Sequence, residues 1–144
     1  MGRFAERTDV TATVEAAFDY VTDQDEVAEW NDHVQRVEII GGAPVEVGSR
    51  LRQYRRRGKR DFVLEFEVTE HERPLRHTVE GAVFGVDTKM EFTFAPHDSG
   101  ARVTMAASVT GRGLRALMAP IVTREMRKST VAALDALRAR LGTA

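Results

Sequence analysis

His77 is the side chain in this sequence best suited to proton transfer near neutral pH. It lies in residues 76–81, whose alternating pattern predicts a β-strand. An imidazole titrates close to neutrality, so a histidine in a pocket can act as a general acid or base or can anchor a ligand. The other interpretation, and the commoner case, is a histidine bonded to a strand carbonyl or a neighbouring side chain. The remaining histidines, His33, His71 and His97, fall at expected turns or strand ends, and we expect them in solvent.

Tyr54 is the second candidate for acid–base chemistry. It lies in an expected strand at 51–57, where successive side chains point to opposite faces. Because Leu51 is apolar, we expect Leu51 and Gln53 to face the interior and Tyr54 to face outward. The alternative orientation would make Tyr54 a proton donor to a substrate carbonyl, so both orientations stay open.

No other arrangement of residues indicates a catalytic, metal or nucleotide site. The chain has no cysteine, and it contains neither an HExxH spacing nor an Asp/His cluster of the kind that binds a metal. Ser49, Ser99, Ser108 and Ser129 stand in no nucleophile motif such as GxSxG. The segment 111–113 lacks the lysine and the spacing of a phosphate-binding loop. We therefore expect no metal and no cofactor.

The densest cluster of charge is the basic segment 50–60. Single-stranded nucleic-acid binding needs stacking aromatics beside the basic residues. Tyr54 is the only aromatic residue in this segment, and acidic residues elsewhere bring the net charge to −1. We expect no nucleic-acid partner and interpret the segment as the solvated side of a hairpin. The alternative is that it steers an anionic ligand towards the mouth of a cavity.

Bulk properties are those of an ordinary globular domain. The length of 144 residues fits one domain, and 42% apolar and 30% charged residues are typical of soluble proteins. No segment resembles a signal peptide or the roughly 20 apolar residues of a membrane span. These features predict a cytoplasmic protein without stable membrane insertion.

The expected order of elements is one strand, two short helices, about six more strands and one long helix. Alternation is clearest in 62–70 and 86–94, and turn residues separate consecutive strands, which favours an antiparallel meander in an α+β fold. The expected strands before the last helix are 4–10, 34–40, 51–57, 62–70, 76–81, 86–94 and 102–109, and the two short helices are 13–20 and 23–30.

The last helix is expected over residues 111–141. Its apolar residues form two stripes that point to sides differing by roughly 150°. Pro120 lies near the change of phase, and a proline inside a helix removes a hydrogen bond and kinks it. We expect a bent helix whose second half packs on the sheet and whose first half covers a ligand cavity. The first stripe contains Leu114, Leu117, Met118, Ile121 and Val122, and the second contains Met126, Leu134, Leu137 and Leu141.

Five parts of the sequence, in this order and spacing, carry a family resemblance: residues 13–23, Trp30, residues 47–50, residues 68–74 and Gly113. With them the chain resembles the START-like (SRPBCC) superfamily of helix-grip proteins, most closely its polyketide cyclase/dehydrase and lipid-transport family. The resemblance implies a START-like, Bet v 1-like fold with a curved antiparallel sheet of about seven strands wrapped around the C-terminal helix. It also implies that residues 1–144 are a single ligand-binding domain with a tunnel between helix and sheet.

The resemblance also suggests which side chains face the ligand. Relatives commonly carry apolar residues at alternate positions after the proline that corresponds to Pro74, and here those positions hold His77 and Val79. An imidazole is therefore expected to point inward. The expected ligand-binding residues are Trp30, Leu51, Gln53, Leu64, Phe66, His77, Val79, Thr88, Met90, Phe92, Met105, Leu117, Met118, Ile121 and Val122.

Three functions fit these expectations. The first is binding of a small, mainly hydrophobic molecule such as a lipid, a polyketide or an aromatic compound, with His77, Gln53 and Thr88 setting its orientation. The second is a polyketide cyclase or dehydratase in which His77 or Tyr54 moves the proton. The third is a protein-interaction module that uses residues 111–122 as its surface. The expected oligomeric state is a monomer or a homodimer.

Overall fold

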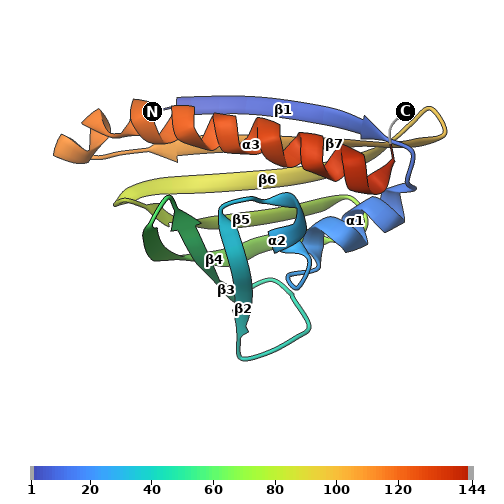
Figure 1. Cartoon of the computed structure of the whole chain (residues 1–144), viewed down its shortest axis with the longest axis horizontal. Helices are drawn as coiled ribbons and strands as arrows, with labels where there is room; N and C mark the ends of the chain where they lie inside the picture. Colours follow the sequence, from blue (N-terminus) through green and yellow to red (C-terminus); the bar gives the residue numbers. More distant parts are fainter. Residues whose placement is uncertain (1, 143–144) are drawn as a thin grey trace.

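The computed structural model describes residues 2–142, and Figure 1 shows one curved sheet with a long helix lying across it. This is the α+β helix-grip arrangement expected from the sequence, and the fold class is confirmed. In chain order the elements are β1 (Gly2–Val10), α1 (Val14–Thr22), α2 (Val27–Trp30), β2 (Val34–Ile40), β3 (Arg50–Arg57), β4 (Arg60–Glu72), β5 (Arg76–Val83), β6 (Val86–His97), β7 (Gly100–Thr110), the 3₁₀ helix η1 (Gly113–Leu117) and α3 (Ala119–Leu141).

The sheet contains seven antiparallel strands in the order β1-β7-β6-β5-β4-β3-β2. Only β1 leaves the meander, because it pairs with β7 and not with β2, and α1 and α2 bridge the gap between the two edges. The register places inward side chains of neighbouring strands directly opposite one another. These cross-strand partners are Leu51 and Phe66, Gln53 and Leu64, Val79 and Met90, and His77 and Phe92.

Helix α1 begins where the sequence indicates a cap. The Thr13 hydroxyl accepts a hydrogen bond from the backbone N–H of Ala16 at 3.1 Å, which satisfies a donor that the helix itself leaves free. Phe18 on this helix is 1% exposed and packs edge-on against Phe94 of β6. The two short helices thus close one end of the curved sheet (Figure 1).

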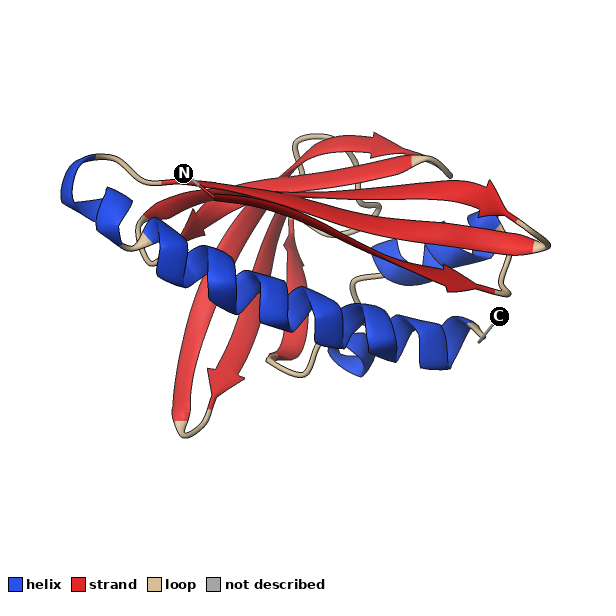
Figure 2. Ribbon diagram, turned by 90° about the horizontal axis from the view of Figure 1, so that it is seen from above, coloured by secondary structure: helices blue, strands red, loops and turns tan. Residues whose placement is uncertain are grey.

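Helix α3 runs diagonally in front of the sheet, as Figure 2 shows from above. It packs along β1 and β7 and against α2. Its second half buries Ala133, Leu134 and Leu137 in the main core with α1, α2 and strands β1, β6 and β7. Strands β2 to β4 curve away from this helix (Figure 2), so α3 packs on the β1 and β7 half of the sheet and not directly on β2 to β4.

The predicted bent helix at 111–141 is wrong in its form. The chain makes the short 3₁₀ helix η1, turns at Met118 and begins α3 as a separate helix at Ala119. Pro120 lies in the first turn of α3, where its missing N–H has no partner to lose and its fixed φ suits the helix. The change of phase between the two apolar stripes is therefore resolved by a break between two helices and not by a kink.

Candidate functional site

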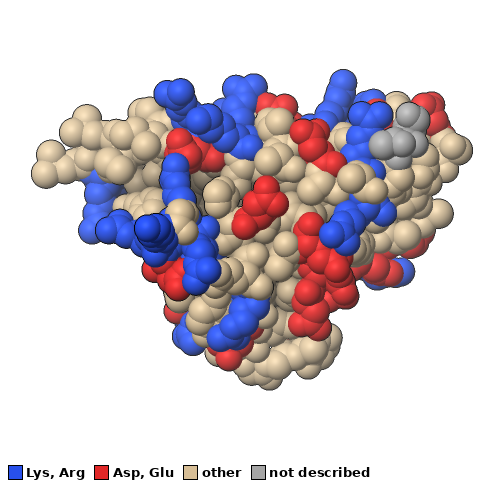
Figure 3. Space-filling view, in the orientation of Figure 1, with Lys and Arg blue, Asp and Glu red and all other residues tan. Residues whose placement is uncertain are grey.

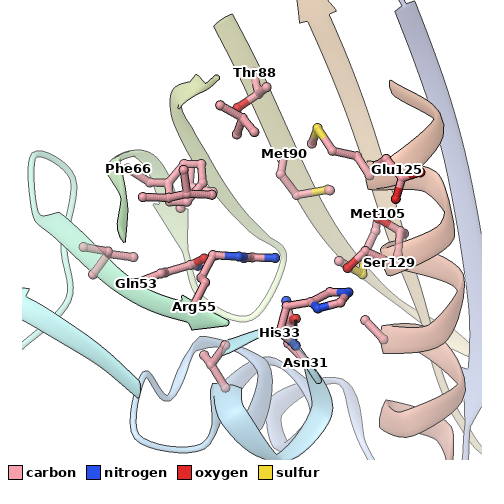
Figure 4. Close-up of a pocket in the computed structure, with 18 of the residues that line it drawn as sticks. Asn31, His33, Gln53, Arg55, Phe66, Thr88, Met90, Met105, Glu125 and Ser129 are labelled. Atoms are coloured by element: carbon pink, nitrogen blue, oxygen red, sulfur yellow. Dashed lines mark hydrogen bonds between the residues drawn. The ribbon is translucent and has the colours of Figure 1, made fainter. Parts of the chain in front are cut away.

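A cavity of about 290 Å³ lies between the inner face of the sheet and α3. Strands β3 to β6 form one wall, α3 from its start to Ala133 forms the opposite wall, and α2 with the residues that follow it closes one end (Figure 4). Most of the lining side chains are aliphatic, aromatic or methionine, and the remainder are polar or charged. Cavities of this kind bind small molecules through apolar contact, while the polar groups fix orientation.

The structure brings most of the predicted ligand-binding residues together in this cavity. Those that line it are Trp30, Leu51, Gln53, Leu64, Phe66, His77, Val79, Thr88, Met90, Phe92, Met105, Met118, Ile121 and Val122. Leu117 and the candidate catalytic residue Tyr54 do not line it.

Tyr54 points to the outer face of the sheet, so its proposed role as a proton donor inside the cavity is wrong. Its hydroxyl donates a hydrogen bond to Glu38 Oε1 at 3.2 Å, and the guanidinium carbon of Arg36 lies 3.7 Å from its ring centre. Leu51 and Gln53 face inward, as the alternation along β3 predicts.

Leu117 fails as a lining residue because η1 turns away from the cavity. Leu117 is 74% exposed and Leu114 is 85% exposed, and only Val122 of the first apolar stripe is buried. The exposed part of the stripe continues to Met118 and Ile121, which reach the mouth of the cavity. In Figure 3 the end of the molecule that holds η1 is largely free of charge, whereas Lys and Arg gather beside it.

His77 faces inward from β5 and is 3% exposed. A register shift in β4 after Val68 changes the phase of that strand, so His71 comes opposite His77, and their Nδ1 atoms lie 3.0 Å apart. Burial, reinforced by the charge of a protonated His71, lowers the pKa of His77 from 6.5 to about 4. At neutral pH His77 is therefore an uncharged imidazole whose Nδ1 is engaged with another histidine. Such a group can hold a ligand by a hydrogen bond, but it is a weak general base.

Two of the predicted orienting groups already have partners within the protein. The Thr88 hydroxyl donates to the carbonyl oxygen of Gly81 at 3.0 Å, and Gln53 Oε1 accepts a hydrogen bond from Arg55 at 2.7 Å. Trp30, by contrast, is 4% exposed, and its Nε1–H has no acceptor among the described residues. The indole packs edge-on against Phe92, with the two ring centres 6.4 Å apart, so Trp30 belongs both to the core and to the cavity wall.

Several polar residues that line the cavity were not predicted from the sequence. Arg55 follows Leu51 and Gln53 at the same period of two, and this alternation was a sufficient signal, but the charge of the surrounding segment suggested a solvated hairpin. His33 also lines the cavity, contrary to the solvent-exposed position expected for it (Figure 4). Glu125 and Ser129 project from α3 one turn apart, and no sequence motif marked them.

The expectations for the other two histidines were also wrong. His71 is half-buried against His77 and the ring of Phe18, because the irregular register of β4 turns it inward. His97 is half-buried and lies 3.3 Å from Asp9, which also forms an ion pair with Arg102. Strand ends are thus more densely packed here than their positions in the sequence indicate.

Neither a metal site nor a membrane span is found between residues 2 and 142. Within this range no three His, Cys, Asp or Glu side chains come together as metal ligands would. Also within it, no helix combines the length and the apolar character needed to cross a bilayer.

Fold, cavity and sequence together identify the class of protein. Residues 1–142 match the family model described as polyketide cyclase / dehydrase and lipid transport, so the chain belongs to this family, as the sequence resemblance indicated. No curated protein sequence matches the chain.

Solved structures of the same fold include Ara h 8.0201, with a TM-score of 0.78, 12% identity, and coverage of 97% of each chain. TTHA0849 from Thermus thermophilus has a TM-score of 0.76, 16% identity, and 97% coverage of each chain. The di-domain ARO/CYC protein StfQ from the steffimycin biosynthetic pathway has a TM-score of 0.77 and 14% identity over 96% of this chain. The chain spans 50% of the length of StfQ. Identities this low establish the shared fold and nothing finer.

Proposed function

We propose that residues 1–144 act as one ligand-binding domain that holds a small, mainly hydrophobic molecule between the sheet and α3. The observation that carries this proposal is the continuous cavity of about 290 Å³ with a mainly apolar lining. Burial of apolar ligand surface contributes about 25 cal/mol per Å², so even a modest ligand gains several kcal/mol in such a site. The family description and the helix-grip fold support the same class of ligand.

An uncharged fluorescent probe, N-phenylnaphthylamine, tests this proposal directly. The wild type should bind the probe with increased fluorescence, because the cavity removes the probe from water. Met90 is half-buried and projects into the cavity from β6 (Figure 4), so Met90→Trp should fill the space and abolish binding. Asp87→Trp on the exposed face of the same strand is the matched control and should bind like the wild type. Equal binding by both variants, each shown by circular dichroism to be folded, would rule out this cavity as the binding site.

The ligand itself can be sought by native mass spectrometry of protein purified from its own host. A retained small molecule would appear as a mass that disappears on denaturation. The same measurement on Met90→Trp should show the bare chain, because the filled cavity has no room for that molecule.

A second candidate function is cyclisation or dehydration of a polyketide-like chain. It is favoured by the family description and by the similarity to the ARO/CYC protein StfQ. In an aldol closure a base removes a proton next to one carbonyl, the resulting enolate carbon bonds to a second carbonyl carbon, and the new alkoxide takes up a proton. His77 is the remaining candidate for both transfers, but a pKa of about 4 makes it a weak base, and we therefore place binding first.

Paired titration and kinetic assays of His77→Ala separate the two functions. A catalytic His77 predicts that the variant still binds a poly-β-ketone substrate analogue but loses turnover. If binding and turnover fall by the same factor, His77 supports the cavity without moving protons.

A third candidate function, a protein-interaction module, is favoured by the exposed apolar stripe on η1 and the start of α3. Sedimentation at increasing protein concentration tests self-association through this stripe. Leu117→Glu should then hold the chain as a monomer where the wild type forms a dimer. A wild type that stays monomeric throughout would leave the stripe as the rim of the ligand cavity.

A further inference from the structure

Arg55 is a half-buried arginine in the lining of a mainly apolar cavity. It stands on the inner face of β3, four residues after Leu51 and two after Gln53. Figure 4 shows its side chain extending from the strand into the space in front of α3. Arginine is rarely placed in such a position without a partner, because removing a charge from water is costly.

No carboxylate in the described part of the chain pairs with Arg55. Its Nε–H is buried without an acceptor, and its one side-chain hydrogen bond is donated to the neutral amide oxygen of Gln53. Glu125 is the acidic residue of the cavity wall, and it is bonded to Arg57 at 2.8 Å. Arg55, Arg57 and Glu125 together leave one positive charge in the lining that is not neutralised.

Two neighbouring arginines of β3, unlike Arg55, are paired with carboxylates. Arg56 contacts both oxygens of Asp61 on the outer face, at 2.6 and 3.2 Å. Arg52 lies within 3.5 Å of Glu65. Burial alone, with no opposing carboxylate, lowers the pKa of Arg55 to about 10, and the group still carries its charge at neutral pH.

A second donor in the same cavity is also without an acceptor, since the Trp30 indole N–H has no partner among residues 2–142. Buried donors that the protein leaves free are costly unless a ligand completes them. These two donors therefore each lack a hydrogen-bond acceptor, and Arg55 also lacks a paired anion.

We propose that the ligand is an apolar molecule with one carboxylate, whose oxygens accept hydrogen bonds from the Arg55 guanidinium. This inference rests on the proposed binding function and names the class of ligand for the same cavity. A planar guanidinium matches the two oxygens of a carboxylate, and one uncompensated positive charge matches one negative charge. The apolar walls then hold the rest of the molecule.

The test compares decanoate with decanol as competitors of N-phenylnaphthylamine, since the two molecules share a chain length and differ in the charged end. The wild type should bind decanoate more tightly than decanol. Arg55→Met keeps the length of an apolar side chain but removes the charge, and it should weaken decanoate binding about 30-fold or more while decanol and the probe bind as before.

Arg56→Met is the matched control, because it removes the same charge from the next residue of β3 on the outer face. It should retain the preference for decanoate. If the wild type binds the probe but does not distinguish decanoate from decanol, or if Arg55→Met keeps the preference, the assignment of Arg55 is overturned while the cavity stands. If the wild type binds neither the probe nor either competitor, the binding function itself fails, and this assignment fails with it.

Discussion

The titration of His77 gives the sharpest stability prediction, because its folded and unfolded states bind protons so differently. The pKa of His77 is about 4 in the folded chain against an ordinary value of 6.5. Above both values the imidazole is neutral in both states and contributes nothing. As the pH falls through 6.5, His77 becomes protonated in the unfolded chain but stays neutral in the folded chain. The free energy of unfolding therefore decreases until about pH 4, where the folded chain also binds the proton.

The size of this loss follows from the same two pKa values. Each unit of pKa difference corresponds to about 1.4 kcal/mol. Integrated over the titration, His77 should cost the folded state about 2 kcal/mol at about pH 5 and about 3 kcal/mol at about pH 4, relative to neutral pH. This is a large share of the roughly 5–15 kcal/mol by which a domain of this kind is stable.

Urea unfolding of the wild type and of His77→Leu at a series of pH values measures this loss, with the single tryptophan, Trp30, as the fluorescent reporter. Protonation of carboxylates whose pKa is lowered by arginine, such as Asp19 beside Arg73, also destabilises the folded chain in acid, but it does so equally in both proteins. The difference between the two curves therefore isolates His77, and His71→Gln reports any share that belongs to the facing imidazole. A constant offset between wild type and His77→Leu from about pH 7 to about pH 4 would refute the reasoning, since a pure packing effect does not depend on pH.

The other predictions concern the cavity and its rim. Without ligand, Arg55→Met should stabilise the chain by about 1–4 kcal/mol and raise the Tm in calorimetry, because it removes a half-buried charge that no carboxylate pairs with; a lower Tm would contradict the burial argument. Leu117→Glu should change the free energy of unfolding by no more than about 0.5 kcal/mol, whereas Leu137→Ala in the core should cost about 2–5 kcal/mol. Tyr54→Phe should leave probe binding unchanged in a fluorescence titration, because the hydroxyl lies on the outer face. Glu125→Gln should tighten decanoate binding severalfold by removing the negative charge from the cavity wall, and weaker binding would argue against an anionic ligand.

Much of the architecture could be predicted from local patterns. The period of two in β4 and β6 decides which side chains are buried, because an alternating strand can bury only one face. The same alternation placed Gln53 inward and Tyr54 outward, as the structure has them. Thr13 predicted the start of α1, because a side-chain cap acts within a single turn and needs no distant partner.

The errors lie where the answer depends on distant parts of the chain. The register shift in β4 that turns His71 towards His77 is a property of strand pairing and leaves no local mark. Pro120 is equally compatible with a kink and with a first turn, and only the break between η1 and α3 at Met118 places it in the first turn of α3.

By itself the sequence determined the α+β order of elements and the inward face of each regular strand, because periodicity and capping are local. Only the tertiary structure decided that Arg55 is an unpaired charge inside a cavity and not one more arginine of a solvated hairpin. The physical reason is that burial and charge pairing are relations between elements far apart in the chain, and here β3, α2 and α3 must all be in place before Arg55 lies half-buried in a cavity without a carboxylate to pair with.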